Sequence, residues 1–154
     1  MIDRFEKFSY AISEISRCWH RIAGEEMEPY GLNGSSSVYF TTLYRHRQGI
    51  TAVQLREICG RDKADVSRTM ALLEKKGLVA REDVDGKAYR ALLKLTPEGV
   101  ALAEHINQKA SAAVEQASLG LPDEKRMVFY EALELITANL QKLSKEGLRN
   151  GGKE

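Results

Sequence analysis

The stretch DKADVSRTMALLEKKGLVAR, residues 62–81, decides the fold of this chain. Apolar residues recur in it at intervals of four and three, which is the spacing of the buried side of an amphipathic helix: Val66, Met70 and Leu73. Asp62 is a residue type that caps the start of helices, and Gly77 is the type that ends them. The stretch therefore predicts one helix whose other side presents polar and charged residues to solvent.

A shorter helix is predicted immediately before this stretch. Thr51 and Gln54 have the three-residue spacing of a capping box, in which each side chain bonds to the other residue's backbone. The inward residues of this helix are expected to be Val53, Leu55 and Ile58. Residues 59–61, Cys-Gly-Arg, then form a tight turn. Two short helices joined by such a turn predict a helix-turn-helix.

After Gly77 the spacing of apolar residues changes from helical to extended. Two strands are predicted, over residues 78–82 and 88–95. Asp85 and Gly86 between them are a two-residue hairpin signal. A helix-turn-helix followed by a hairpin is a winged helix-turn-helix, a fold whose second helix enters the major groove of DNA.

Further helices are predicted on both sides of this module. The first helix carries apolar residues at alternating intervals of three and four: Phe5, Phe8, Ile12, Ile15, Trp19 and Ile22. The last helix, which begins near Pro122, repeats this pattern: Phe129, Leu133, Ile136, Leu140 and Leu143. Residues 35–37 are candidate N-caps of a helix over residues 38–47, and Thr96 opens another helix after the hairpin. The predicted fold class is mainly α with a small β-hairpin wing.

Residues 62–81, followed by LKLTPEG at residues 93–99, resemble the MarR family of bacterial and archaeal transcription regulators. The resemblance extends over nearly the whole chain. It implies an obligate homodimer in which the first helix and the last two helices interlock, with both winged modules on successive major grooves of a pseudo-palindromic operator. Residues 1–32 and 97–148 would form the helical dimerisation region, residues 33–96 the DNA-binding region and residues 149–154 a flexible tail.

The composition is that of a folded protein, with 43% hydrophobic and 29% charged residues. No apolar run approaches the roughly 20 residues needed to cross a bilayer. Residues 1–7 mix charged and apolar side chains where a signal peptide has an apolar run. We therefore expect a cytoplasmic protein without a membrane partner.

Charge is distributed unevenly along the chain. Residues 45–90 contain 11 Lys and Arg against 7 Asp and Glu, whereas the flanking segments are net acidic. A basic segment that coincides with the winged module favours double-stranded DNA as the partner. Arg68 is expected to contact guanine, and Asp65 to accept from a cytosine amine or to orient Arg68. The candidate DNA contacts are Ser35, Ser37, Lys63, Asp65, Ser67, Arg68, Thr69, Lys87 and Arg90.

The wing differs from the usual family pattern. Members of the family commonly hold an Asp and an Arg close together near the wing tip, and that Arg enters the minor groove. Counting back from Thr96, this chain has Tyr89 where the Arg is expected and Lys87 where the Asp is expected. Lys87 and Arg90 are the candidate substitutes.

Aromatic residues gather on the first two predicted helices. With the cations beside them they are the candidate lining of a pocket for a small aromatic anion: Arg17, Trp19, His20, Arg21, Tyr39 and Tyr44. Their alternative role is packing in the core. The function predicted from these features is a repressor that a small-molecule effector releases from its operator.

Two other functions stay open at this stage. The redox-sensing branch of the family has its reactive cysteine about two turns before Cys18, where this chain has Ala11, but the cations beside Cys18 keep a redox sensor as one alternative. We expect Cys18 and Cys59 to pack as small buried hydrophobes. The other alternative is a winged-helix module that binds proteins without affinity for DNA.

Catalysis and metal binding are not indicated. The three histidines fall on three different predicted helices, and the sequence has no GxSxG, P-loop or HExxH motif. Some relatives bind zinc with a second histidine one turn after the position of His105, where this chain has Lys109. We therefore predict no enzymatic activity, no cofactor and no metal.

Overall fold

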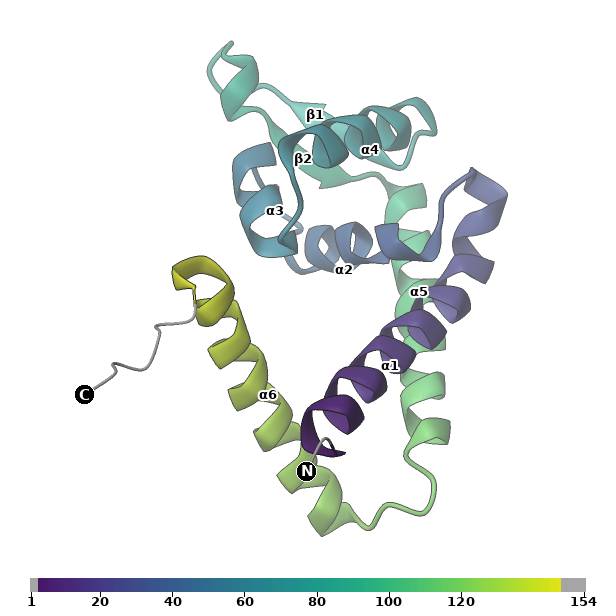
Figure 1. The fold of residues 1–154 in the computed structure, drawn as a ribbon. Coiled ribbons are helices and arrows are strands. Elements are labelled where there is room, and N and C mark those ends of the chain that lie inside the picture. Colours follow the sequence, from purple (N-terminus) through teal and green to yellow (C-terminus); the bar gives the residue numbers. More distant parts are fainter. Residues whose placement is uncertain (1–2, 148–154) are drawn as a thin grey trace, which may run out of the picture. The chain divides into compact units, whose positions relative to one another are not determined.

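A computed structural model describes residues 3–147, apart from the side chain of Ala88 (Figure 1). These residues fall into two compact units that divide after Ala113. The first unit contains most of the helices and the hairpin. The second contains the end of one long helix and the whole of the last helix. Within residues 3–147, no helix is long and apolar enough to span a membrane.

The elements of the first unit follow the predicted order of helices and strands. In chain order they are α1 (Asp3–Met27), the 3₁₀ turns η1 (Glu28–Tyr30) and η2 (Gly34–Ser36), α2 (Ser37–Arg45), α3 (Ala52–Cys59), α4 (Lys63–Lys75), β1 (Val79–Glu82), the 3₁₀ turn η3 (Ala88–Arg90), β2 (Leu92–Leu95) and α5 (Pro97–Ala117), whose last turn belongs to the second unit. The second unit also holds α6 (Asp123–Glu146). The predicted class, mainly α with a hairpin wing, is therefore confirmed.

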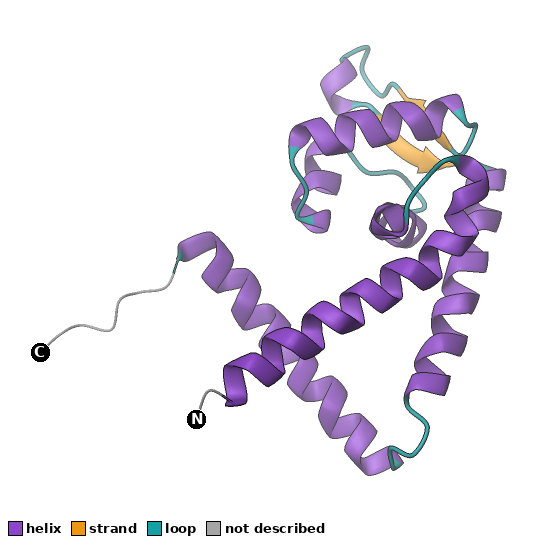
Figure 2. Cartoon of the chain, turned by 45° about the vertical axis from the view of Figure 1, so that its right-hand side comes forward, coloured by secondary structure: helices purple, strands orange, loops and turns teal. Residues whose placement is uncertain are grey.

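The core of the first unit is formed where α2, α3, α4 and the hairpin meet (Figure 2). Its largest fully buried side chains include Phe40 and Leu43 of α2, Leu55 of α3 and Met70 and Leu73 of α4. The hairpin is antiparallel, with Val79 opposite Leu95 and Glu82 opposite Leu92. Ile50, just before α3, forms two backbone hydrogen bonds with Leu93 of β2. Its N–H donates to the Leu93 carbonyl at 3.1 Å and its carbonyl accepts from the Leu93 N–H at 2.8 Å, which attaches the segment before α3 to the sheet.

Helix α3 packs with a different side from the one predicted. Its capping box is present, with Thr51 Oγ1 accepting from the Gln54 backbone N–H at 3.2 Å. Leu55 is buried, but Val53 and Ile58 are about half exposed, so their assignment as inward residues was wrong. Ala52 and Cys59 pack on the core with Leu55 instead. Spacings of three and four residues keep these three on one side of a helix, whereas Val53 and Leu55 are only two apart.

The wing has shorter strands and a longer loop between them than the sequence predicted. Residues 88–91 were expected to belong to the second strand, but Arg90 N–H donates to the Lys87 carbonyl at 2.9 Å and closes the turn η3. Val84 and Tyr89 at this tip are more than half exposed. Of the described side chains at residues 89–91, only that of Ala91 is buried, so alternation has no continuous buried face to match, and the strand begins at Leu92.

The entry to α2 also differs from the prediction. Ser36 is the N-cap residue, but its side chain makes no capping bond to the helix backbone. Ser35 and Ser36 instead donate to Asn33 Oδ1, at 2.5 and 3.5 Å. Helix α1 continues through Gly24 and ends at Met27.

Gly34 is the closest approach between α1 and η2. A methyl group added to its Cα would lie 1.6 Å from the backbone oxygen of His20, a distance that no rotation of a side chain can relieve. Only a glycine therefore lets this turn rest on α1. Gly24 lies on the α1 side of the same contact. A methyl group added to its Cα would lie 3.5 Å from the backbone nitrogen of Gly34, an ordinary van der Waals distance, so Gly24 would accept it.

Gly34→Ala is expected to lower the free energy of unfolding by about 3 kcal/mol, because backbone must move to admit the added carbon. Gly24→Ala is the matched control and is expected to raise it by about 0.5–1 kcal/mol, because alanine loses less entropy in a helix interior. Urea denaturation of the two variants at equal protein concentration measures both effects. Equal stabilities would contradict the close approach at Gly34.

Candidate nucleic-acid interface

Helix α4 presents one continuous exposed side. Asp62 caps the helix, its carboxylate accepting from the Asp65 backbone N–H at 2.7 Å. Because Val66, Met70 and Leu73 are buried, the residues on the opposite side remain exposed: Lys63, Ala64, Ser67, Arg68, Ala71 and Lys75. Three of the candidate DNA contacts, Lys63, Ser67 and Arg68, lie in this set. The small alanines beside Arg68 leave its guanidinium unobstructed.

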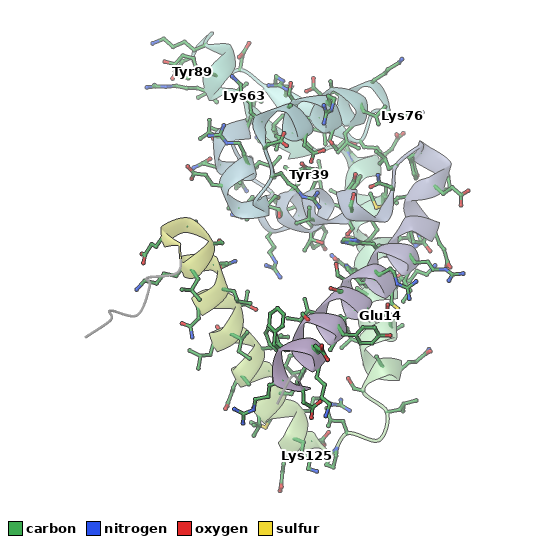
Figure 3. All side chains as sticks on the ribbon, viewed as in Figure 1. Glu14, Tyr39, Lys63, Lys76, Tyr89 and Lys125 are labelled. Atoms are coloured by element: carbon green, nitrogen blue, oxygen red, sulfur yellow. The ribbon has the colours of Figure 1, made fainter. Side chains whose placement is uncertain are left out.

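The edge of α4 that faces α2 carries the other two candidates of this helix. Asp65 and Thr69 are half-buried, and the carboxylate of Asp65 accepts a hydrogen bond from the Tyr39 hydroxyl. Tyr39 is labelled in Figure 3. Burial first, and then the bond to Asp65, raise the pKa of Tyr39. Its hydroxyl is therefore a proton donor at neutral pH, and the Asp65 carboxylate is already engaged by the protein.

The two candidate serines before α2 make contacts within the protein. The carbonyl of Ser35 accepts from Arg61 Nη2 at 2.9 Å, and Ser37 is only 4% exposed. The Ser37 carbonyl accepts from Thr41 Oγ1 at 3.2 Å. In the single chain, Ser37 is therefore buried, whereas Lys63 and Arg68 are exposed.

The wing tip carries both of its candidate cations on the surface. Arg90 Nη1 lies 3.6 Å from Asp85 Oδ2, and the Arg90 guanidinium lies over the Tyr89 ring at 5.7 Å from its centroid. Lys87 is exposed next to them. An Asp–Arg pair thus exists at this tip, but it joins Asp85 and Arg90 across the turn, away from the positions expected from the family pattern.

A hollow of about 250 Å³, which was not predicted from the sequence, lies between α3, α4 and β1. Its lining includes three cations, Arg56, Lys63 and Arg81. Arg81 donates twice to Glu74 Oε1, at 3.1 and 2.8 Å, and so links β1 to the end of α4. Arg56 and Arg81 belong to the basic segment, but nothing in their spacing predicts that they share one surface.

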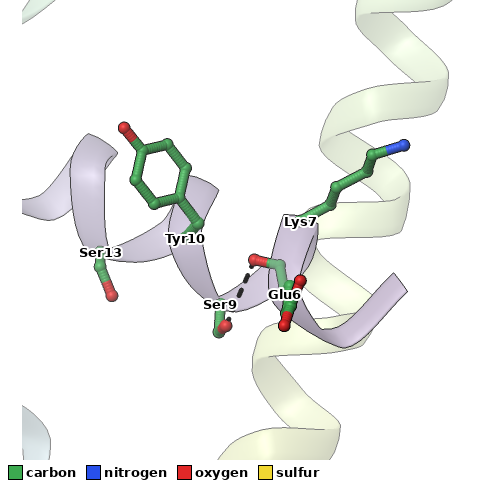
Figure 4. A pocket seen from close by; sticks show the side chains of 5 residues that line it. All are labelled: Glu6, Lys7, Ser9, Tyr10 and Ser13. Atoms are coloured by element: carbon green, nitrogen blue, oxygen red, sulfur yellow. Dashed lines mark hydrogen bonds between the residues drawn. The ribbon is translucent and has the colours of Figure 1, made fainter. Parts of the chain in front are cut away.

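The predicted effector residues are dispersed among several environments. Tyr39 is buried, Trp19 and His20 are half-buried, and Arg17 and Arg21 are exposed. The carboxylate of Glu14 accepts from Arg17 Nη2 at 2.7 Å, which lowers the pKa of Glu14. Tyr44 donates to Glu104 of α5 at 3.3 Å. A second described hollow lies on α1, where its lining residues are Glu6, Lys7, Ser9, Tyr10 and Ser13, none of them predicted (Figure 4).

The two cysteines differ from the buried packing that was expected. Cys18 is exposed on α1, so that expectation was wrong for this residue in the single chain. Cys59 is half-buried, its Sγ lies 3.4 Å from Thr42 Oγ1, and burial raises the pKa of its thiol.

Lys109, at the position where some relatives have a zinc-binding histidine, binds Glu25 at 2.6 Å and Glu26 at 3.1 Å, which joins α5 to α1. Within the described part of the chain, no three His, Cys, Asp or Glu residues are grouped as metal ligands.

Comparison with known proteins identifies this arrangement. Residues 30–88, from before α2 to the wing tip, match the model of the MarR family. Over this segment the chain resembles the MarR family. Its structure is similar to a MarR transcriptional regulator from Methanosarcina mazei Go1, with 27% identity, a TM-score of 0.77 and coverage of 90% of this chain and 92% of the other.

Two other solved structures share the fold at lower identity. A putative MarR family transcriptional regulator from Listeria monocytogenes, complexed with a 26mer DNA, is 23% identical, with a TM-score of 0.79 and coverage of 93% and 97%. MepR of S. aureus, in a DNA complex, is 23% identical, with a TM-score of 0.74 and coverage of 90% and 99%. These two likenesses extend over both the winged module and the flanking helices.

The cap of α4 makes a direct prediction. Asp62→Ala is expected to lower the free energy of unfolding by about 1 kcal/mol, because the Asp65 backbone N–H loses its acceptor. Asp62→Asn keeps a side-chain oxygen in place and is expected to retain most of the stability. Urea denaturation compares the two; an equal loss in both would assign the effect to charge near the helix N-terminus instead of to the cap.

Proposed function

We propose that this chain is a homodimeric, sequence-specific DNA-binding transcription regulator, and that it represses until a small-molecule effector releases it. The observation that carries the proposal is the exposed side of α4, where Arg68 is exposed between the small residues Ala64 and Ala71. A helix of this kind fits the major groove, and an arginine at its centre makes the commonest specific contact, to guanine O6 and N7.

Charge supports DNA as the partner. Lys63, Arg68 and Lys75 are exposed on α4, and Lys87 and Arg90 are exposed on the wing. Phosphate contacts from such residues fix a protein on the duplex, while base contacts supply sequence preference. Two proteins of the same fold, from L. monocytogenes and S. aureus, have been solved with DNA, which agrees with this assignment.

Exposed apolar residues support a homodimer. In the single chain, Phe5, Ile12 and Ile15 of α1 are exposed, and α6 has no buried residue among those described. The predicted seam of α6 is between 37% and 48% exposed along its length: Phe129, Leu133, Ile136, Leu140 and Leu143. Apolar stripes of this length mark interaction surfaces. A second copy, with the same repeats on its own helices, offers a matching surface.

Release by an effector requires two conformations of the dimer. A ligand lowers DNA affinity only if it binds better to the conformation that does not fit the operator. Of the predicted effector residues, His20 lies where α1 meets η2, against Gly34, and Trp19 precedes it on α1. Titration with small phenolic and benzoic acids tests this part of the proposal, because binding at Trp19 should quench its fluorescence over the concentration range that releases DNA.

Selection of bound sequences from a random duplex pool tests the function as a whole. Two α4 helices related by a two-fold axis predict a symmetric motif with half-sites about 10 bp apart. Affinity for the selected duplex should fall steeply as salt rises, because bound phosphates release counterions. A protein-contact module would select no motif and show no such salt dependence.

Arg68→Ala is expected to cost about 1–3 kcal/mol on the selected site and to relax base preference at one position of each half-site. Lys87→Ala and Arg90→Ala are the controls, expected to weaken binding to all sequences alike. Repeated selection with each variant, together with binding titrations, measures both effects. An unchanged motif for Arg68→Ala would show that another residue reads that base.

Leu140→Asp is expected to lower dimer content and DNA affinity together, because it places an unpaired charge within the apolar contact between chains. Ala138→Asp introduces the same residue on the opposite side of α6 and is the matched control. Sedimentation at several concentrations and DNA titration on the same samples provide the measurement. An intact dimer for Leu140→Asp would place the interface elsewhere.

A further inference from the structure

We propose that Asp65 is a positioning residue, whose bond to Tyr39 fixes the rotation of α4 about its axis, and that it makes no base contact. This inference rests on the proposed function, because it concerns how α4 is held while Arg68 reads DNA. It also reassigns Asp65, which by sequence alone is a candidate for contact with cytosine.

Asp65 lies on a half-buried edge of α4. Asp65, Thr69 and Leu72 follow one another at intervals of four and three, so they share one edge of the helix. All three are half-buried, and Leu72 packs against the core. The fully exposed residues, Arg68 among them, belong to the neighbouring side. Asp65 is therefore directed toward the protein interior more than toward solvent.

The partner of Asp65, Tyr39, is buried. Tyr39 is 1% exposed, and its ring is fixed in the core of α2 beside Phe40 and Leu43. A buried hydroxyl needs an acceptor, and the Asp65 carboxylate supplies one across 26 residues of sequence. Because the phenol is rigid and α2 is held by its own packing, this bond joins α4 to a fixed point.

A neighbouring contact holds the same end of α4. Arg61, in the turn before the helix, donates to the Ser35 carbonyl at 2.9 Å. Its positive charge lowers the pKa of Tyr39, in the direction opposite to the larger effects of burial and of the bond to Asp65. The start of α4 is thus attached at two points, one to η2 and one to α2. Rotation of α4 would have to break the Tyr39–Asp65 bond.

Rotation matters because base recognition depends on direction. A turn of α4 about its axis moves Arg68 sideways across the groove, whereas it leaves the total charge of the surface unchanged. Loss of the Tyr39–Asp65 bond should therefore reduce the preference for the operator over unrelated DNA. The ratio of the two affinities is the quantity to measure, since it cancels the general effect of removing one negative charge.

The test uses the full-length protein and four variants: Tyr39→Phe, Asp65→Ala, Asp65→Asn and the double variant Tyr39→Phe/Asp65→Ala. Fluorescence anisotropy measures affinity for the selected duplex and for a scrambled duplex, at a temperature where circular dichroism finds each variant folded. Tyr39→Phe removes only the hydroxyl, so the ring packing remains. Thr41→Val is the matched control, because it removes a hydroxyl of α2 that bonds only within that helix.

We expect Tyr39→Phe and Asp65→Ala each to lower the affinity ratio about tenfold, with the same selected motif. The double variant should lose no more than Asp65→Ala alone, because both changes remove one interaction. Asp65→Asn should recover most of the ratio, because its amide oxygen still accepts from Tyr39. Thr41→Val should leave the ratio unchanged.

Three results would overturn the proposal. A changed base preference in Asp65→Asn would show that Asp65 contacts a base. An unchanged affinity ratio in Tyr39→Phe would show that the bond has no role in recognition. A double variant whose loss equals the sum of the two single losses would show that Tyr39 and Asp65 act separately. If the unsubstituted protein selected no motif at all, the proposed function itself would fail, and this inference with it. That outcome is distinct from the three others, which require a parent protein that binds its operator.

Discussion

Burial of one side of α4 is the constraint on which the rest of this structure depends. Val66, Met70 and Leu73 are each no more than 3% exposed, and they meet α2, α3 and the hairpin in a single core. Burying each such side chain contributes about 1.5–3 kcal/mol. A rotation large enough to expose them would lose these contributions, so the proposed role of the Tyr39–Asp65 bond concerns the smaller rotations that the core still allows. The core thereby decides which residues remain for a nucleic acid to contact.

The two edges of the exposed side of α4 have different surroundings. On one edge, Lys63 and Ser67 border the hollow that Arg56 and Arg81 complete, so this edge is open and basic. On the other edge, the carboxylate of Asp65 is engaged by Tyr39. Negative charge is therefore held against the protein while positive charge is left facing solvent. This asymmetry suits a surface that meets phosphate, even though the whole chain carries a formal charge of only +1.

The winged module and the flanking helices obtain their stability in different ways. The module has a closed core, with Phe40, Leu43, Leu55 and Leu93 fully buried. The apolar stripes of α1 and α6 remain accessible in the single chain, which is an unfavourable arrangement for side chains of this size in water. In the proposed homodimer, association with a second copy would relieve this cost and would also set the spacing of two α4 helices. The same helices would then link assembly to DNA recognition.

Several local features were determined by the sequence alone. The spacing of Val66, Met70 and Leu73, the capping box of Thr51 and Gln54, and the ends set by Asp62 and Gly77 each involve residues within a few positions of one another. Such signals arise from backbone geometry and from helix periodicity, so they survive without knowledge of the rest of the fold. They sufficed to predict the winged helix-turn-helix and the exposed position of Arg68.

Tertiary structure decided what depends on distant partners. The bond from Tyr39 to Asp65 and the bond from Arg61 to Ser35 each span 26 residues, and no local spacing records them. The inward side of α3 followed from the core it meets, and the wing tip became a 3₁₀ turn because no second layer covers it. Local sequence sets which conformations a segment prefers, whereas the shape of the shared core selects which side of each segment is buried. The role of a polar residue such as Asp65 follows from that second choice.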